Sequence, residues 1–373
     1  EKKIEALYIT RSMQDRAEQL SKESTAVEEQ LTTVSQLSNL SLQLYSWYIK
    51  NGVARNEKEG DDAKEYFEKH LPKQADKLTG FYEQLYLFQS HCWVAFIRQD
   101  YLLYYRYTQK WVDLFEKYPA MIEAETAHYI KGMHNLMSAH FDLRNYTKFN
   151  ETICRFEAFT QTPTVLDNQN NTIQTFVYLH LSKINRHFME GTFEAGIAEI
   201  PVIEEKLIEY ELFLDRHRVL VFYYKFASLY FGAGNHSMSI DYLNKVINLK
   251  GDLRTDLQCY ARLLHLIAHY ELGNFEILEH LLKSVTRFMA KMENLGLAEA
   301  EIFGFLKRSF RLQPSALKPA FEKLLENLKA VEQDKLASRA FMYLDVISWL
   351  ESKIEGKEVQ DIIRDKYLRS IKE

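Results

Sequence analysis

The chain has 373 residues, of which 46% are hydrophobic and 27% charged, and its formal net charge is −5. Its 23 Tyr, 23 Phe and 4 Trp argue against disorder, because disordered chains are poor in aromatic residues. Acidic and basic residues are mixed along the chain, without the basic stripe that neutralises nucleic-acid phosphates. We therefore expect no nucleic-acid partner.

Only 13 Gly and 6 Pro occur in the whole length, which favours long helices over a fold with many tight turns. No apolar run approaches the roughly 18 residues that span a bilayer, so no membrane partner is expected. The cysteines are odd in number and far apart, which favours free thiols in a reducing compartment and predicts a cytoplasmic location. The composition indicates no cofactor. The cysteines are Cys92, Cys154 and Cys259.

Five segments share one pattern, in which a helix is followed by a tight polar or glycine turn, an aromatic residue or His, and a second helix. Successive segments are 45, 47, 43 and 39 residues apart. Gly or Asn in such a turn supplies the left-handed cap that ends the first helix. A single helix pair cannot bury its apolar face, so neighbouring pairs are expected to stack into an array. The aromatic or His positions are Tyr101, Tyr146, Phe193, His236 and Phe275.

The segment from Tyr224 to Leu249 resembles a tetratricopeptide repeat. Ala227 and Tyr230 stand where that family has a small residue and an aromatic in its first helix, and Gly234 stands at the turn. Leu264 to Leu282 is similar to the same unit. The resemblance implies an all-α protein, an α-α superhelix that forms a right-handed solenoid, with a period longer than the family's usual repeat.

The array is predicted to occupy residues 73–311. N-terminal helices over 1–72 pack on it or continue it, and C-terminal helices over 312–373 cap it. The polar link Asn51–Asp62 is expected to separate two N-terminal helices. Apolar positions carry the helical pattern at both ends: Leu31, Val34, Leu37, Leu44 and Trp47 near the start, and Leu336, Phe341 and Leu344 near the end.

No phosphate-binding glycine loop or nucleophile elbow occurs, so we predict that the protein is not an enzyme. The best metal candidate is the i,i+4 pair His265 and His269, with Cys259 and His280 nearby in sequence. A zinc ion needs a third ligand from elsewhere. We interpret the pair as packing residues and predict no metal site, with zinc binding as the alternative.

The resemblance places the first helices of successive pairs along a concave groove that holds extended peptides or partner helices. Lys131 and Asn135 are spaced like the residues with which some members of the family hold a peptide carboxylate. Tyr with small polar groups is typical of a binding surface, although inter-helix packing is an equal alternative for each tyrosine. The groove positions that the resemblance implies are Lys131, His134, Asn135, Ser138, Tyr178, Asn185, Tyr224, Ser228 and Tyr260.

The sequence therefore favours a non-enzymatic scaffold that binds a protein or peptide segment in the concave groove of a tetratricopeptide-like solenoid. The alternative is a ligand- or peptide-responsive regulatory protein, in which the N-terminal helices are an effector element and Asn51–Asp62 is a hinge. The sequence gives no indication of the oligomeric state.

Overall fold

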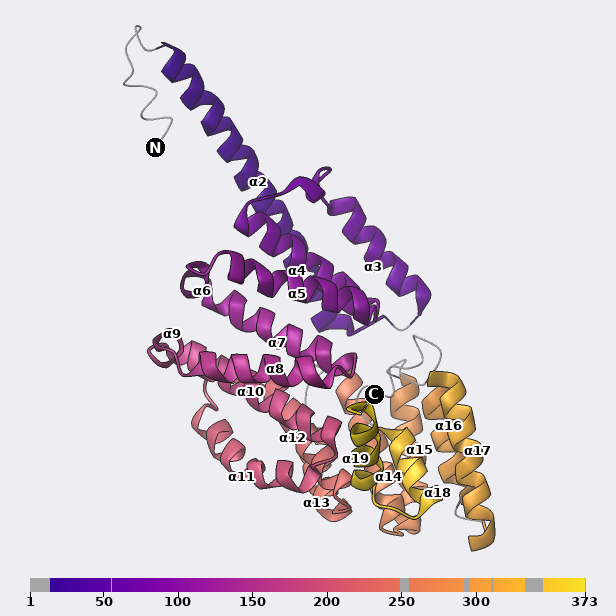
Figure 1. Ribbon diagram of the computed structural model, residues 1–373. Helices are drawn as coiled ribbons and strands as arrows, with labels where there is room; N and C mark the ends of the chain where they lie inside the picture. The colour runs from indigo at the N-terminus through magenta and orange to yellow at the C-terminus, as the bar shows by residue number, and fades with distance from the viewer. Residues whose placement is uncertain are drawn as a thin grey trace. The chain divides into compact units, whose positions relative to one another are not determined.

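A computed structural model describes residues 14–54, 56–248, 255–291, 296–309, 312–332 and 345–372 (Figure 1). Within these ranges the chain forms eighteen α-helices and one short 3-10 helix and contains no β-strand, which confirms the all-α prediction. Leu249, Leu336, Phe341 and Leu344 lie outside the described residues. The chain divides into two compact units, one of residues 1–53 and 58–124 and the other of residues 54–57 and 125–373. None of the helices described here is both long and apolar enough to cross a membrane.

The first unit is built around the packing of α2 on α4 and of α4 on α5. The rings of Tyr45 and Trp93 lie 4.8 Å apart in the contact between α2 and α4. With 38 residues, α2 is about 57 Å long, whereas the 17 residues of α4 extend about 26 Å, so α2 continues beyond its partner. Leu31, which was expected on the apolar face, is accordingly 63% exposed. The elements are α2 (Gln14–Asn51), α3 (Glu57–His70), η2 (Ala75–Lys77), α4 (Phe81–Ile97), α5 (Tyr101–Lys117) and α6 (Met121–Ala124).

The predicted link Asn51–Asp62 is wrong over its second half, because residues 57–62 belong to α3. Glu and Lys are good helix formers, and a charged segment is therefore not by itself a loop. The break between the helices is shorter: Gly52 has a φ of 77°, and its N–H donates to the carbonyl of Tyr48 at 2.7 Å.

The second unit contains the remaining helices. They are α7 (Thr126–Asp142), α8 (Tyr146–Thr160), α9 (Pro163–Leu166), α10 (Gln169–Glu190), α11 (Phe193–Glu209), α12 (Arg216–Gly232), α13 (His236–Ile247), α14 (Thr255–Glu271), α15 (Phe275–Lys291), α16 (Leu297–Ser309), α17 (Pro314–Glu332), α18 (Val346–Glu355) and α19 (Val359–Ser370).

The five turns recognised in the sequence share one geometry. Each of the five aromatic or His residues is the first residue of the second helix of its pair, in α5, α8, α11, α13 and α15. The residue before each of these positions donates its N–H to the carbonyl five residues earlier, as in a Schellman turn, and its own predecessor is left-handed. Glycine fills the left-handed position in three turns, whereas the other two use Gln99 and Arg144 with φ of 54° and 52°.

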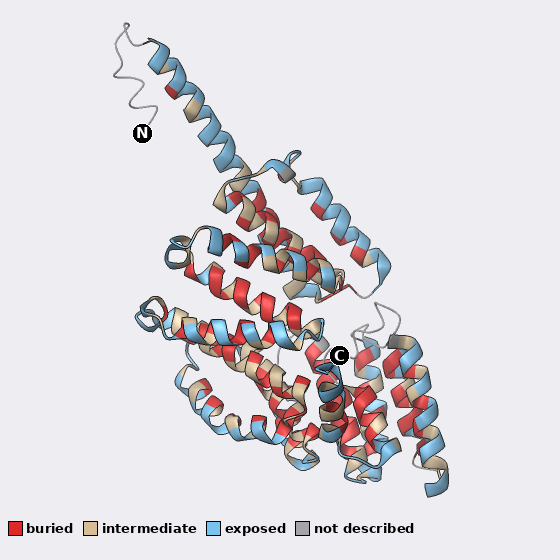
Figure 2. Ribbon diagram, viewed as in Figure 1, coloured by how far each residue is buried: buried red, intermediate tan, exposed pale blue. Residues whose placement is uncertain are grey.

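The first helices of successive pairs form a continuous layer in the second unit, since α7 packs on α10, α10 on α12 and α12 on α14. Figure 2 shows burial concentrated along α7, whereas α11 is largely exposed. Side chains on neighbouring first helices are thus brought together although they are far apart in sequence, as are Asn185 and Lys225, which are separated by 40 residues.

The C-terminal helices return to earlier parts of the second unit. Helix α18 packs on α17, and α19 packs on both α18 and α10. The guanidinium of Arg364 donates to the carbonyl of Glu190, 174 residues earlier, at 3.1 Å. Gly191 has a φ of 67°, and a Cβ there would lie 2.6 Å from the backbone nitrogen of Arg364, so glycine is required for this close approach. The helix predicted to cap the array therefore also covers the turn between α10 and α11.

Candidate ligand-binding surface on α7, α10 and α12

Polar and aromatic side chains from three first helices converge in the second unit. We call this group the α7–α10–α12 cluster. Helix α7 contributes five residues, which recur at intervals of about one turn along one face. Helices α10 and α12 each contribute a pair seven residues apart. The cluster consists of Lys131, His134, Asn135, Ser138 and Asp142 of α7, Tyr178 and Asn185 of α10, and Arg218 and Lys225 of α12.

Tyr178 lies at the centre of one half of the cluster. Its ring stacks on the imidazole of His134 with centroids 4.0 Å apart and planes 10° apart. The Nζ of Lys131 lies 5.5 Å from the ring centroid, and the guanidinium of Arg218 lies 5.6 Å from it. Both distances are within the range of cation–π attraction. One aromatic ring thus organises cations from two different helices.

Lys225 organises the other half. Its ammonium donates to the side-chain oxygen of Asn185 and lies 5.2 Å from the ring centroid of Phe188. Burial lowers the pKa of Lys225 to about 8, and the nearby carboxylate of Asp142 only partly opposes this effect. Burial likewise raises the pKa of Asp142 to about 7, opposed by the charge of Lys225. Both side chains are nevertheless half-buried by accessible surface, so they lie in a recess that water still reaches.

The potential at His134 is positive. Its pKa is held well below the usual value first by burial, and then by the charges of Lys131, Arg218 and Lys225. Arg218 has an acidic neighbour, because its Nε lies 3.3 Å from the carboxylate of Asp215. A negatively charged group placed beside His134 would therefore be attracted.

The same face of α7 carries unused hydrogen-bonding capacity. Asn135 is 3% exposed, and its side-chain NH₂ has no hydrogen-bond partner among the described residues. The Nδ1 of His134 is likewise buried and without a partner in the described ranges. An unpaired buried amide costs about 1–3 kcal/mol.

The structure brings together several of the residues that the sequence implicated. Lys131 and His134 meet Tyr178, and Asn185 meets Lys225. The hydroxyls of Ser138 and Ser228 are half-buried and donate to carbonyls of their own helices, at 3.0 Å and 2.9 Å.

Two predicted groove positions need correction. Tyr224 and Tyr260 are only 3% and 1% exposed, so they belong to the hydrophobic core. The assignment by repeat spacing was one position off on α12, where Lys225 rather than Tyr224 faces the cluster.

Sequence reasoning missed Asp142, Arg218 and Lys225. A signal was present, because Arg218 and Lys225 stand seven residues apart on a helix whose remaining residues from Val219 to Gly232 are uncharged. Two helical turns separate such residues, which places them on one face.

The histidine pair of α14 is buried. The rings of His265 and His269 lie 4.5 Å apart, both residues are more than 90% buried, and Asn274 donates to Nδ1 of His269 at 3.1 Å. Within the described ranges, no three His, Cys, Asp or Glu side chains are grouped to hold a metal ion. Cys259 is fully buried.

The sequence matches no protein-family model, and the searches of curated proteins and of solved structures also return no match. The chemistry of the cluster is therefore the basis for a functional assignment.

Proposed function

We propose that this chain is a non-enzymatic binding protein of the tetratricopeptide-like type, which receives an acidic segment of a protein or peptide on the α7–α10–α12 cluster. In this proposal the helix pairs form a right-handed superhelix with its first helices on the concave side. The observation that carries the proposal is the convergence of three cations from two helices on His134, beside the unpaired amide of Asn135. The shared Schellman turns support the repeat resemblance.

The cluster suits a carboxylate in two respects. Arg218 and the lysines supply charge-assisted donors, and Asn135 supplies a neutral donor from a nearby position on the same layer. The half-buried Phe188 adds apolar surface on which the rest of a segment can pack. Desolvation of Lys225 strengthens its attraction for an anion, since the interaction takes place in a medium of lower effective dielectric than water.

The direct test uses hexapeptides of defined sequence that contain Asp and Glu, each paired with a counterpart in which Asn and Gln replace the acids. The probe is a fluorescent label, and fluorescence anisotropy measures binding to the full chain at 150 mM salt. We expect at least one acidic peptide to bind at least tenfold more tightly than its neutral counterpart, a difference of about 1.4 kcal/mol.

The matched variants separate this surface from the general charge of the protein. The double variant Arg218→Gln, Lys225→Gln should weaken binding at least tenfold. The control Lys206→Gln, Arg216→Gln changes the net charge equally at a half-exposed position of α11 and an exposed position of α12, and it should leave affinity within about twofold. Equal binding of acidic and neutral peptides, or equal loss in both double variants, would contradict the assignment.

A further inference from the structure

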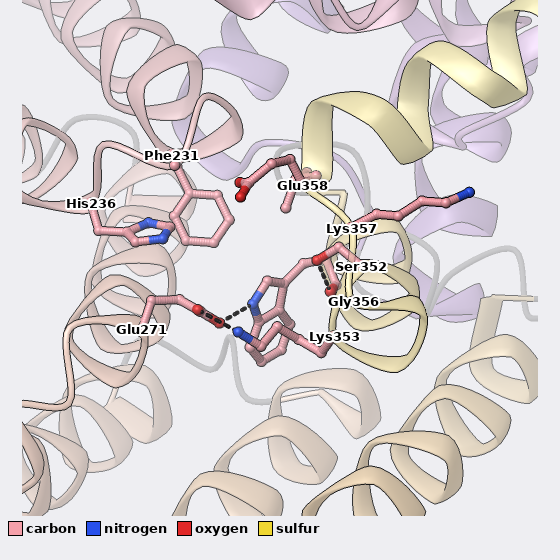
Figure 3. A pocket seen from close by; sticks show the side chains of 11 residues that line it. Phe231, His236, Glu271, Ser352, Lys353, Gly356, Lys357 and Glu358 are labelled. Atoms are coloured by element: carbon pink, nitrogen blue, oxygen red, sulfur yellow. Dashed lines mark hydrogen bonds and ion pairs between the residues drawn. The ribbon is translucent and has the colours of Figure 1, made fainter.

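A second site lies elsewhere in the second unit, beneath the turn between α18 and α19. A cavity of about 350 Å³ opens there between the α12–α13 turn, the last residue of α14 and the α18–α19 corner. This volume is at the lower end of the range of small-molecule sites. Trp349 is part of its lining. Figure 3 labels the other principal side chains, which are Phe231, His236, Glu271, Lys353 and Glu358.

The floor of the cavity is a closed network. Glu271 accepts a hydrogen bond from the indole N–H of Trp349 at 2.7 Å and another from the ammonium of Lys353 at 2.7 Å. The Glu271 side chain is 9% exposed. Because Lys353 is held by this carboxylate, its charge is already compensated and contributes little attraction for an anion.

The rim carries a carboxylate without such compensation. Glu358 precedes the first residue of α19 but makes no side-chain capping bond, and no ion pair joins it to another residue of the described ranges. Figure 3 shows its carboxylate directed toward Phe231 and His236. Its Oε2 lies 3.2 Å from the position that a Cβ of Gly234 would occupy, so it reaches across to the α12–α13 turn.

The other polar groups of the lining are mainly acceptors. Burial lowers the pKa of His236 against the opposing charges of Glu271 and Glu358, which favours the neutral imidazole with one ring nitrogen as an acceptor. Its Nδ1 has no hydrogen-bond partner among the described residues. The hydroxyl of Ser352 donates to the carbonyl of Trp349 at 2.7 Å, so its oxygen can still accept a hydrogen bond. Lys357 extends away from the cavity in Figure 3 and pairs with Glu355 at 3.1 Å and with Asp365 at 3.2 Å.

We propose that this cavity binds a small organic amine as its ammonium ion. The cavity presents the Glu358 carboxylate, a neutral His236 and the Ser352 hydroxyl as acceptors, whereas its inward cation, Lys353, is already paired. A ligand that complements it must donate several hydrogen bonds and carry positive charge, and a primary ammonium does both. The aliphatic part of the ligand lies near Phe231 and Val359.

The experiment measures binding of cadaverine (1,5-diaminopentane) to the full chain by isothermal titration calorimetry at pH 7.5 and 150 mM salt. The control ligand is 1,5-pentanediol, which has the same length without the charge. We expect cadaverine to bind and to raise the melting temperature, and the diol to do neither. A blocked lysine, N-acetyl-lysine-N′-methylamide, distinguishes the sources of the ammonium: tighter binding of cadaverine indicates a free amine, and tighter binding of the blocked lysine indicates a protein side chain.

Two carboxamide variants separate a specific site from attraction by the net negative charge. Glu358→Gln should weaken cadaverine binding at least fivefold, because it removes the uncompensated carboxylate while making no change to a capping bond. Glu355→Gln lies three residues away, does not line the cavity and should bind as the wild type does. The proposal would be overturned if both variants lost affinity to the same extent, or if Glu358→Gln bound cadaverine as tightly as the wild type. It would also be overturned if the wild type did not bind cadaverine.

Discussion

The α7–α10–α12 cluster and the cavity beneath the α18–α19 turn both gather charged side chains around a histidine whose pKa is lowered by burial. They differ in how those charges are compensated. In the cavity, Glu271 is held by two donors at 2.7 Å. In the cluster, Lys225 donates to the neutral amide of Asn185, and its pKa falls to about 8 because burial outweighs the attraction of Asp142.

This difference separates charges that hold the fold from charges that are available to a ligand. A charge with full hydrogen bonding stabilises the segments that it joins, and its removal leaves its partners unpaired. A desolvated charge with incomplete compensation contributes little to stability, but its attraction for an oppositely charged ligand is strong. The contrast predicts that the stability of the fold depends more on Glu271 than on Lys225.

The largest expected effect concerns two neighbouring residues of α12. Tyr224→Ala should lower the free energy of unfolding by about 3–5 kcal/mol, because it removes a large side chain that is 3% exposed. Lys225→Met should change it by less than about 1 kcal/mol, since Asn185 and Asp142, which lose their partner, are half-buried and stay within reach of water. Urea unfolding followed by circular dichroism measures both. A loss in Lys225→Met as large as that in Tyr224→Ala would show that Lys225 is structural.

A smaller loss is expected at the floor of the cavity. Glu271→Gln should lower the free energy of unfolding by about 1–3 kcal/mol, because the Lys353 ammonium loses its charged partner beside buried Trp349. The control is Glu279→Gln, whose ion pair with Lys283 is exposed on both sides and should contribute less than about 0.5 kcal/mol. Equal losses in Glu271→Gln and Glu279→Gln in thermal unfolding would show that the Glu271 network stabilises the fold no more than a surface ion pair does.

The smallest expected effect is a pH dependence from Asp142. Its pKa is raised to about 7 in the folded chain, above the value of about 3.9 in an unfolded chain, so the folded state binds the proton more tightly. The contribution of this group to the free energy of unfolding is therefore largest below pH 4, and it is lost as the pH rises toward 7. Asp142→Asn should remove this loss of stability. We expect the loss to be on the order of 1 kcal/mol, because solvent reaches the carboxylate and weakens the effect.

Urea midpoints at pH 5 and pH 7 measure that change, with Asp241→Asn on the exposed face of α13 as the control. An identical change of midpoint between the two pH values in wild type and Asp142→Asn would contradict the assignment. Lys225 acts in the opposite sense at higher pH: its lowered pKa makes the folded state release the proton first, so stability rises above about pH 8.

Local chemistry in the sequence determined much of the secondary structure. Asn235 accepts a hydrogen bond from the N–H of Met238, and Gly234 takes a φ of 78°, so the turn before α13 follows from two adjacent residues. Gln99 and Arg144 occupy the same left-handed position without being glycine. The recurrence of the aromatic position, rather than glycine alone, was the signal that located all five turns.

Tertiary structure decided which helical faces became surfaces. On α12 the sequence analysis placed Tyr224 in the groove and missed Lys225. The packing of α12 on α10, α13 and α14 buries Tyr224 and leaves Lys225 close to Asp142. The hydrogen bond between Trp349 and Glu271 joins residues 78 positions apart. The one between Arg364 of α19 and Glu190 of α10 joins residues 174 positions apart. Turn chemistry depends on neighbours in the chain and can be read from sequence, whereas long-range pairing depends on how whole helices stack, which no local pattern encodes.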